Sequence, residues 1–352
     1  MAKRLHIDAI QTAPPGKVTP PDQARSVFMS VPPATVAVIA QTRFQVVMYY
    51  NPAGTEESPL TVAARVKESL SAALPERPVL SGRLRKKEAE SAGGGRWEVK
   101  FNDAGVRLVH ATAEVTMADV IGSKEAHEVQ AHLAYWDDVT QFEGDGYSIG
   151  VSCSLLLADP FFLIKFLVSW AEIHTQMLTP ATLLKSSMFH LSYFQRPDRP
   201  NRLRSIELAL SDTNRHPSSS NPYATMLFEV RQRDSSQSYD AMAIACLREA
   251  TARLKARPVS EFVLIVSHQV GDLTVKTLAN SSSTTTVQSD DVECDVAWWD
   301  QFGMEELSLA PGNKPVHVSS QIIFDGNDDG LVVIMIPESE TRLLISVTLP
   351  NV

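Results

Sequence analysis

The sequence predicts an α/β protein of two similar lobes, each a mixed β-sheet flanked by helices. Segments typical of strands and of helices alternate in both halves of the chain. A proline-rich stretch with few apolar periods separates the halves, and 44% hydrophobic against 21% charged residues suffice for a large core. We therefore expect an N-terminal lobe over residues 1–178, a crossover linker over 179–222 and a C-terminal lobe over 223–352.

The first half contains strand and helix signals in a definite order. Short runs of β-branched and aromatic residues predict strands, and apolar residues at helical spacing predict helices. Pro75 ends the first clear helix, and Pro160 stands at the start of the last one. The expected strands are 43–50, 97–101, 106–110 and 146–157, and the expected helices are 60–74, 116–121 and 161–177.

The second half repeats this order after the linker. Its last three strands close the chain, and the expected elements are strands at 224–230, 262–266, 317–324, 330–336 and 343–349 with a helix at 239–255. Residues 267–291 are mostly polar, so we expect little sheet there. Within them, the low-complexity run 280–286 predicts a mobile loop.

Charge and cysteine content exclude several classes of protein. The formal net charge is −9, from 32 Lys and Arg against 41 Asp and Glu, so no nucleic-acid partner is expected. Cys153, Cys246 and Cys294 are widely spaced and odd in number, which indicates a reducing compartment and no metal site. No run is apolar enough for a signal peptide or a transmembrane segment. The acidic pair Asp137-Asp138 is expected to be solvated surface.

Four segments of the first half resemble the plant BAHD acyltransferase family of the chloramphenicol-acetyltransferase superfamily. Their order and spacing carry the resemblance, and they are residues 66–84, 101–106, 139–150 and 158–171. The resemblance covers most of residues 1–178, weakens over 180–290 and returns near the C-terminus. It implies the two-lobed fold of that superfamily, and the second lobe is shorter than the family pattern.

The family's catalytic motif is His-x-x-x-Asp, and here the corresponding residues run from Leu155 to Asp159. The resemblance implies a histidine base that deprotonates a hydroxyl or amine, which then attacks an acyl-CoA thioester. Imidazole suits this role because its pKa lies near neutral pH, whereas leucine has no proton-accepting atom. No catalytic residue is therefore assigned. Asp159 is expected to be buried and held by hydrogen bonds or by an arginine of the second lobe.

The nearest histidines in sequence do not offer a clear replacement for the base. His132, His174 and His190 are expected to be surface or capping residues. His174 lies about four turns along the helix after Asp159, about 20 Å away.

The family's second motif, Asp-Phe-Gly-Trp-Gly, is also altered. The nearest match is Asp300-Gln301-Phe302-Gly303-Met304, which keeps Asp300 and Gly303 as structural residues but lacks the tryptophan and second glycine. Trp298 and Trp299 are expected to replace the lost packing as buried core residues.

Within the family, the chain resembles the eceriferum-type clade of cuticular wax synthesis most closely. The carrying segments are residues 142–146, 153–160, 169–174, 314–319 and 347–350. This resemblance implies an accessory role in very-long-chain fatty acid elongation, with a fatty-acid elongase condensing enzyme as partner. It also implies a cytoplasmic location or a peripheral one on the endoplasmic reticulum through that partner. No cofactor is expected, and acyl-CoA is the ligand to consider.

Two alternatives stay open. In the first alternative, the chain is an acyl-CoA-dependent transferase, or catalyses another reaction in the same cleft, with a non-standard base. Alternatively, it is a degenerate product without activity, as the short second lobe suggests.

Overall fold

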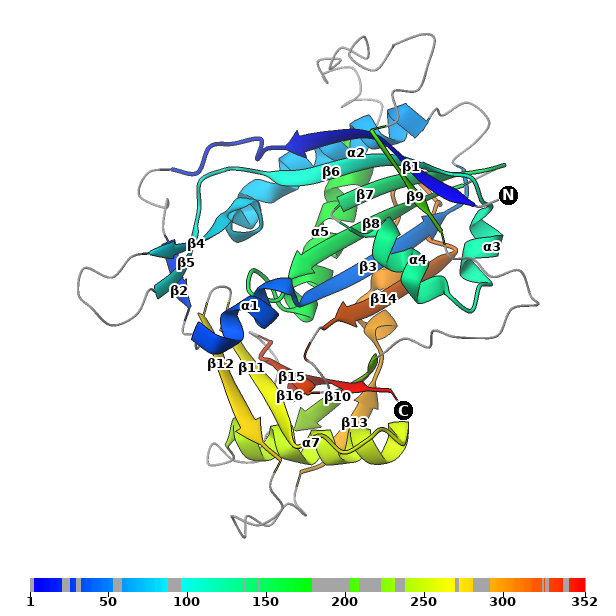
Figure 1. Cartoon of the computed structure of the whole chain (residues 1–352). Coiled ribbons are helices and arrows are strands. Elements are labelled where there is room, and N and C mark those ends of the chain that lie inside the picture. The colour runs from blue at the N-terminus through cyan, green and yellow to red at the C-terminus, as the bar shows by residue number, and fades with distance from the viewer. Residues whose placement is uncertain are drawn as a thin grey trace.

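A computed structural model gives the fold (Figure 1). It describes residues 3–20, 26–29, 33–52, 59–87, 96–135, 137–144, 146–178, 203–208, 223–231, 238–269, 272–280, 292–324, 326, 329–337 and 342–351. The described strands are β1 (Arg4–Ala13), β2 (Ser26–Met29), β3 (Arg43–Tyr50), β4 (Arg83–Lys87), β5 (Arg96–Lys100), β6 (Val106–Ala113), β7 (Asp137–Phe142), β8 (Tyr147–Ser154), β9 (Arg204–Glu207), β10 (Tyr223–Arg231), β11 (Glu261–Gln269), β12 (Asp272–Ala279), β13 (Cys294–Ala297), β14 (His317–Ile323), β15 (Gly330–Met335) and β16 (Arg342–Pro350). The α-helices are α1 (Pro33–Gln41), α2 (Pro59–Ala73), α3 (Met117–Ile121), α4 (Ala126–Leu133), α5 (Pro160–Met177) and α7 (Tyr239–Leu254).

Two large mixed sheets dominate the described part of the chain, and they confirm the predicted α/β class. One sheet has seven strands in the order β14-β3-β8-β7-β6-β1-β9, and the other has six in the order β12-β11-β15-β16-β10-β13. Each is mixed, because β6 pairs with β7 and β11 pairs with β15 in parallel while the other pairs are antiparallel. A small three-stranded sheet, β2-β5-β4, stands beside them.

The seven-stranded sheet is buried on both faces. Along β3, Phe44 and Val46 pack with the core under α2 and α5, whereas Val47 and Tyr49 pack with the core under α3 and α4. This alternation follows from the two-residue period of a strand. A strand covered on both faces reads as a continuous apolar run, which is why β3 and β8 were predictable from the sequence.

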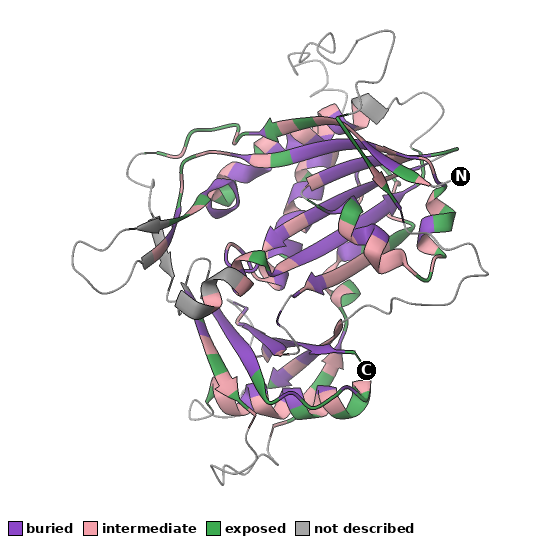
Figure 2. Ribbon diagram, in the orientation of Figure 1, coloured by how far each residue is buried: buried purple, intermediate pink, exposed green. Residues whose placement is uncertain are grey.

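The six-stranded sheet separates two apolar layers. Its outer face packs on α7, with Phe228 and Ile345 among the buried residues. Its inner face packs with the first lobe, because Ile265, Val333 and Leu344 belong to the same cluster as residues of α2 and α5. Figure 2 shows the buried residues running along the central strands of both sheets.

Three strands differ from the simple division expected from the sequence. β14 comes from the second half but pairs with β3 at the edge of the first sheet. β9 falls in the expected linker and pairs with β1. The polar stretch after residue 267 was expected to contain little sheet, but β12 lies there as an edge strand on β11. One face of β12 is buried through Leu273 and Val275 while Thr274 on the other face is exposed, so β12 contains no continuous apolar run.

Most of the expected linker, and all of the low-complexity run beyond residue 280, lie outside the described residues.

Gly150 sets the distance between β8 and the end of α4. A Cβ at this position would lie 1.8 Å from the carbonyl oxygen of Leu133. We expect Gly150→Ala to lower the free energy of unfolding by about 3 kcal/mol, because buried backbone would have to move. Urea unfolding followed by circular dichroism measures this. Gly122→Ala is the matched control, since its Cβ would meet only Ala118 O at 3.2 Å; equal losses for the two variants would contradict the packing argument.

Candidate functional site

The loop between β8 and α5 carries the motif position and is fixed by backbone hydrogen bonds. Leu155 N–H donates to Thr42 O at 3.1 Å, and Leu157 N–H donates to Ser154 O at 2.9 Å. The Leu155 side chain is 1% exposed and belongs to the core shared by the two lobes. The residue that the sequence comparison with the motif expects at the place of its base is therefore an apolar side chain closed to solvent.

Asp159 joins the two lobes at the end of this loop. Its side chain caps α5, because one carboxylate oxygen accepts from Phe162 N–H at 2.9 Å, and Pro160 follows at the first helical position. The other oxygen accepts from the hydroxyl of Ser267, on β11 of the second sheet, at 2.6 Å. Burial raises the pKa of Asp159, and the hydrogen bonds from Ser267 and Phe162 oppose that rise. The hydrogen bonds match the expectation, but the cross-lobe partner is a serine instead of an arginine.

The segment after β13 packs against the start of α5. Residues Trp299–Phe302 form a 3-10 helix that ends at Gly303, whose φ of 90° is readily adopted by glycine. Phe302 meets Phe161 edge to face with ring centroids 5.5 Å apart, and Trp299 lies 5.2 Å from Phe44. The structure thus brings this segment next to the N-terminus of the helix that Asp159 caps.

Of the residues around the second motif, Trp299 packs against the core, whereas Trp298 and Asp300 face solvent. Trp299 packs against the core, as expected, but Trp298 is 63% exposed, so the expectation that both are buried is wrong. Trp298 lies in extended backbone one residue before the 3-10 helix, where successive side chains point to opposite sides. The side chain of Asp300 is exposed, whereas Gly303 lies against Val168 of α5.

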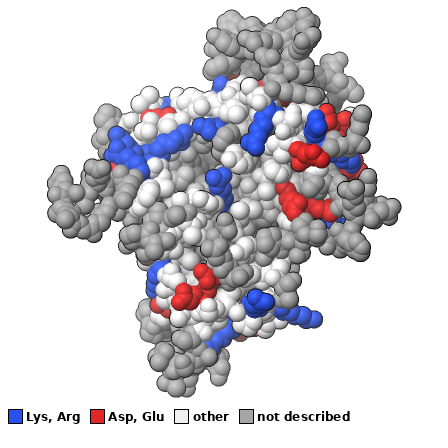
Figure 3. Space-filling view, viewed as in Figure 1, with Lys and Arg blue, Asp and Glu red and all other residues white. Residues whose placement is uncertain are grey.

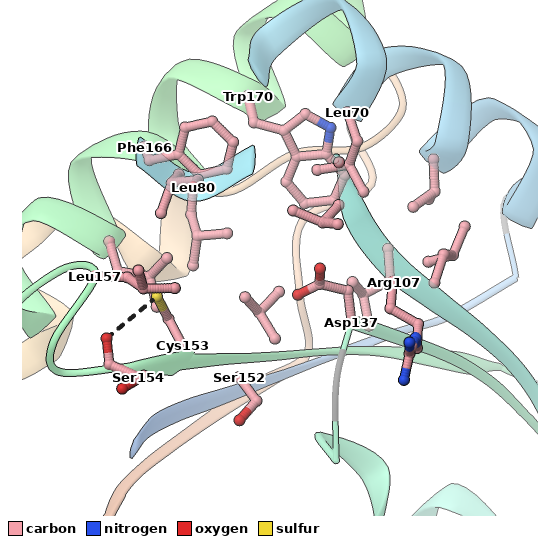
Figure 4. Close-up of a pocket in the computed structure, with 18 of the residues that line it drawn as sticks. Leu70, Leu80, Arg107, Asp137, Ser152, Cys153, Ser154, Leu157, Phe166 and Trp170 are labelled. Carbon is pink, nitrogen blue, oxygen red and sulfur yellow. Dashed lines mark hydrogen bonds between the residues drawn. The ribbon is translucent and has the colours of Figure 1, made fainter. Parts of the chain in front are cut away.

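A cavity of about 300 Å³ lies beside the motif loop, between the seven-stranded sheet and helices α2 and α5 (Figure 4). Apolar side chains such as Leu70, Phe166 and Trp170 form most of its wall, and Leu157 connects it to the motif loop. Its volume is about twice that of a cavity able to hold benzene, so it is large enough for a short stretch of hydrocarbon.

One carboxyl group points into this apolar cavity. Figure 4 shows the Asp137 side chain directed into the space between the sheet and the helices, whereas Arg107 points away from it. Burial, with a smaller contribution from the charge of Asp138, raises the pKa of Asp137 to about 8. Asp137 is therefore mostly protonated at neutral pH, where it can donate a hydrogen bond but is a poor proton acceptor.

The sequence prediction for this acidic pair was wrong. Asp137 and Asp138 were expected on solvated surface, but Asp138 is 3% exposed and Asp137 lines the cavity. β7 is a short strand inside the sheet, paired with β6 and β8, and both its faces are covered, because Val139 packs in the core under α2 and α5 and Phe142 in the core under α3 and α4. The available signal was the strand pattern of residues 137–142, which places Asp137 and Val139 on one face and Asp138 and Thr140 on the other and so indicates a strand instead of a surface loop.

None of the described histidines considered as a replacement base is suited to that role. His174 is 4% exposed, and its Nδ1 lies 2.8 Å from Ser69 Oγ, which also accepts from the Trp170 indole N–H. Burial, with the nearby charge of Arg65, lowers the pKa of His174 to about 4. It is a buried structural residue, which differs from the surface or capping position expected. His132 lies on α4, across the sheet from α5, and His190 lies outside the described residues.

The described residues contain no cluster of three or more His, Cys, Asp or Glu side chains arranged to hold a metal ion. Among the helices that the structure describes, none combines the length and apolar character needed to span a bilayer. The face in Figure 3 carries both basic and acidic groups among its described residues.

The Asp159–Ser267 hydrogen bond should couple the stabilities of the two lobes. We expect Asp159→Ala to lower the free energy of unfolding by about 2 kcal/mol and Ser267→Ala by about 1 kcal/mol. The double variant should lose about 1 kcal/mol less than the sum, because both single changes remove the same bond. Equilibrium unfolding of the four proteins measures this coupling. Ser238→Ala, which removes a cap of α7 within one lobe, is the control and should be additive with Ser267→Ala.

Asp137 should make stability fall as pH rises. The unfolded chain loses this proton near pH 4, whereas the folded chain keeps it until about pH 8, so the folded state binds more protons in between. Asp137→Asn removes this titration. We expect the variant to gain at least about 1 kcal/mol relative to the parent between pH 5 and pH 8. Unfolding at both pH values measures it, with the exposed Asp300→Asn as control; parallel pH profiles for Asp137→Asn and the parent would refute the argument.

Comparisons with known proteins place the chain in a family. The sequence profile described as "Transferase family" matches residues 34–237. Protein ECERIFERUM 26-like of Arabidopsis thaliana is 28% identical over 169 residues, which are 43% of this chain and 38% of that protein. The matched region therefore spans well under half of that relative.

Solved structures give a remote likeness. Vinorine synthase is 14% identical with a TM-score of 0.48, and the alignment covers 99% of this chain and 94% of that chain. TRI101 of F. sporotrichioides, in complex with coenzyme A and T-2, is 11% identical with a TM-score of 0.44, covering 93% and 95%. Because the family profile covers more than half of the 352 residues, this protein belongs to the transferase family, the BAHD family that its sequence motifs resemble.

Proposed function

We propose that this protein does not carry out the acyl transfer of its family and instead acts as an accessory factor in very-long-chain fatty acid elongation for cuticular wax. The observation that carries the proposal is Leu155. At the position of the catalytic base stands a buried aliphatic side chain, 1% exposed and packed in the core between the lobes. A general base contributes about 10² to 10⁴ in rate, and leucine can supply none of this.

The surroundings of Leu155 support the loss of the base. The second motif has also changed, and its Asp300 is exposed within the 3-10 helix Trp299–Phe302, which packs on α5. His174 is buried with a pKa lowered to about 4, chiefly by burial, and lies about 20 Å along α5 from Asp159. Burial raises the pKa of Asp137 to about 8, which favours its protonated form at neutral pH. These side chains offer no ready proton acceptor beside the motif loop.

The motif loop nevertheless keeps its architecture. Asp159 still caps α5 and contacts the second sheet through Ser267. A fold maintained in this way suits a role in binding that does not use the base. Similarity to Protein ECERIFERUM 26-like over 169 residues supports a place in the eceriferum-type clade. In this proposal the chain acts with a fatty-acid elongase condensing enzyme at the endoplasmic reticulum, and acyl-CoA is its ligand.

Two assays on the same protein test the proposal. In the first, purified chain is incubated with acyl-CoA and a panel of alcohols and amines, and free CoA is measured with a thiol reagent. In the second, the chain is co-expressed with a condensing enzyme in yeast, and the lengths of the fatty acids are measured. We expect no CoA release above background, and a shift to longer products that depends on the chain. Acceptor-dependent CoA release would favour a transferase with a non-standard base, and the absence of both effects would favour a degenerate product.

A histidine at position 155 distinguishes between two explanations for an absence of acyl transfer: a cleft that lacks only its base, and a cleft that is incomplete in other respects. We expect Leu155→His to lower the free energy of unfolding by about 1 to 3 kcal/mol, because it buries a polar ring in an apolar core. It should release no CoA and should still lengthen the products at temperatures where it is folded. Leu156→His, at the adjacent buried position, is the matched control for stability. CoA release by Leu155→His alone would show an intact cleft that lacked only its base, and would overturn the proposal.

A further inference from the structure

Two thiols from distant parts of the second lobe lie in contact. Cys246 is on α7 and Cys294 begins β13, and their Sγ atoms are 3.4 Å apart. Cys246 faces the six-stranded sheet and is fully buried, whereas Cys294 is partly exposed at the edge of that sheet. A disulfide needs an S–S distance of about 2.05 Å, so a small adjustment of the side chains would allow the bond.

The two thiols differ in reactivity. The hydrogen bond between the two sulfurs raises the pKa of Cys246, and burial raises it further. The same hydrogen bond lowers the pKa of Cys294, with the nearby cation of Arg253 acting in the same direction. Burial and the carboxylates of Glu249 and Asp295 oppose this lowering. Because the thiolate is the reactive form, the partly exposed Cys294 is the thiol to react first.

We propose that Cys246 and Cys294 form a reversible disulfide, and that this pair is an oxidative modification site of the protein. The proposal rests on the contact between the two sulfurs, on the exposure of one and on the enclosure of the other. It does not depend on the function proposed above. In a reducing compartment such a bond is transient and responds to oxidants.

The chemistry balances with a peroxide as oxidant. The Cys294 thiolate attacks a peroxide oxygen, so that an S–O bond forms, the O–O bond breaks and the leaving oxygen departs as water after protonation. Cys246 then attacks the sulfur of the sulfenic acid, an S–S bond forms and a second water leaves. Two thiols and one hydrogen peroxide thus give one disulfide and two waters. A dithiol reductant returns the two electrons and the two protons.

The bond would fix the edge of the sheet next to the candidate site. β13 pairs with β10 over four residues and is an end strand of the six-stranded sheet. One residue after β13 comes the 3-10 helix Trp299–Phe302, which packs on Phe44 and Phe161. A covalent link from Cys294 to α7 would hold the strand that leads into this segment. Oxidation would therefore stabilise both the second lobe and the packing beside α5.

The experiment uses the full chain, reduced and then treated with one equivalent of hydrogen peroxide. Remaining thiols are alkylated, and intact mass and non-reducing peptide maps are recorded. We expect loss of two hydrogens, a peptide linking Cys246 with Cys294, and an alkylated Cys153. Cys153 is the internal control, because burial, with the charge of Asp137, raises its pKa to about 12. The melting temperature should rise on the order of 5 °C and return with dithiothreitol.

Single variants show whether the peroxide-dependent rise in melting temperature comes from the Cys246–Cys294 pair. Cys153→Ser should keep the peroxide-dependent rise, whereas Cys294→Ser should lose it. Cys246→Ala should also lose it, and it avoids placing a hydroxyl at a fully buried site. A peptide map of the parent protein that shows both thiols alkylated, Cys294 oxidised to sulfinic acid without a link, or disulfides only between molecules would overturn the proposal. This readout does not require any variant to fold.

Discussion

The apolar layer between the two large sheets is the constraint on which the rest of this structure depends. The inner face of the six-stranded sheet, with Ile265 and Val333, packs into the same core as helices α2 and α5. Burial of apolar surface on this scale is the main favourable contribution to folding. The motif loop lies in that layer, so each of its side chains must be apolar or fully hydrogen-bonded. Leu155 meets the first condition and Asp159 meets the second, through Phe162 N–H and Ser267.

Under the proposal that Leu155 stands where the family has its base, this constraint accounts for the retention of the fold. A histidine at position 155 would need hydrogen-bond partners in an otherwise apolar layer, whereas a leucine needs only space. Asp159 has two structural tasks that do not involve proton transfer, capping a helix and contacting the second sheet. These structural tasks keep the aspartate necessary whether or not the loop carries a base. The cavity beside the loop has a mostly apolar wall, and the carboxyl group of Asp137 points into it (Figure 4).

Much of the fold was predictable from the sequence because buried strands and amphipathic helices have strong local patterns. The strand 43–50, the helix after Pro160 and the helix beginning at Tyr239 all lie where their patterns predict them. β12 was missed because it contains no continuous apolar run, and the cavity was missed because a void depends on side chains from several elements. Asp137 illustrates this best: its sequence neighbour Asp138 suggests surface, whereas its position between β6 and β8 places it inside. The helix-capping role of Asp159 was local and accessible, but its partner Ser267 lies 108 residues away.

The position of β14 has a consequence for biosynthesis. β3 pairs with β8 on one side and with β14 on the other, and β14 comprises His317–Ile323. During translation, the hydrogen-bonding groups along that side of β3 therefore stay without their native partner until residues 317–323 have been made. An apolar strand with an open edge is prone to pair with other chains. The nascent protein thus carries an aggregation hazard that ends only when β14 has left the ribosome, and the first sheet cannot mature before the second half of this sequence has been made.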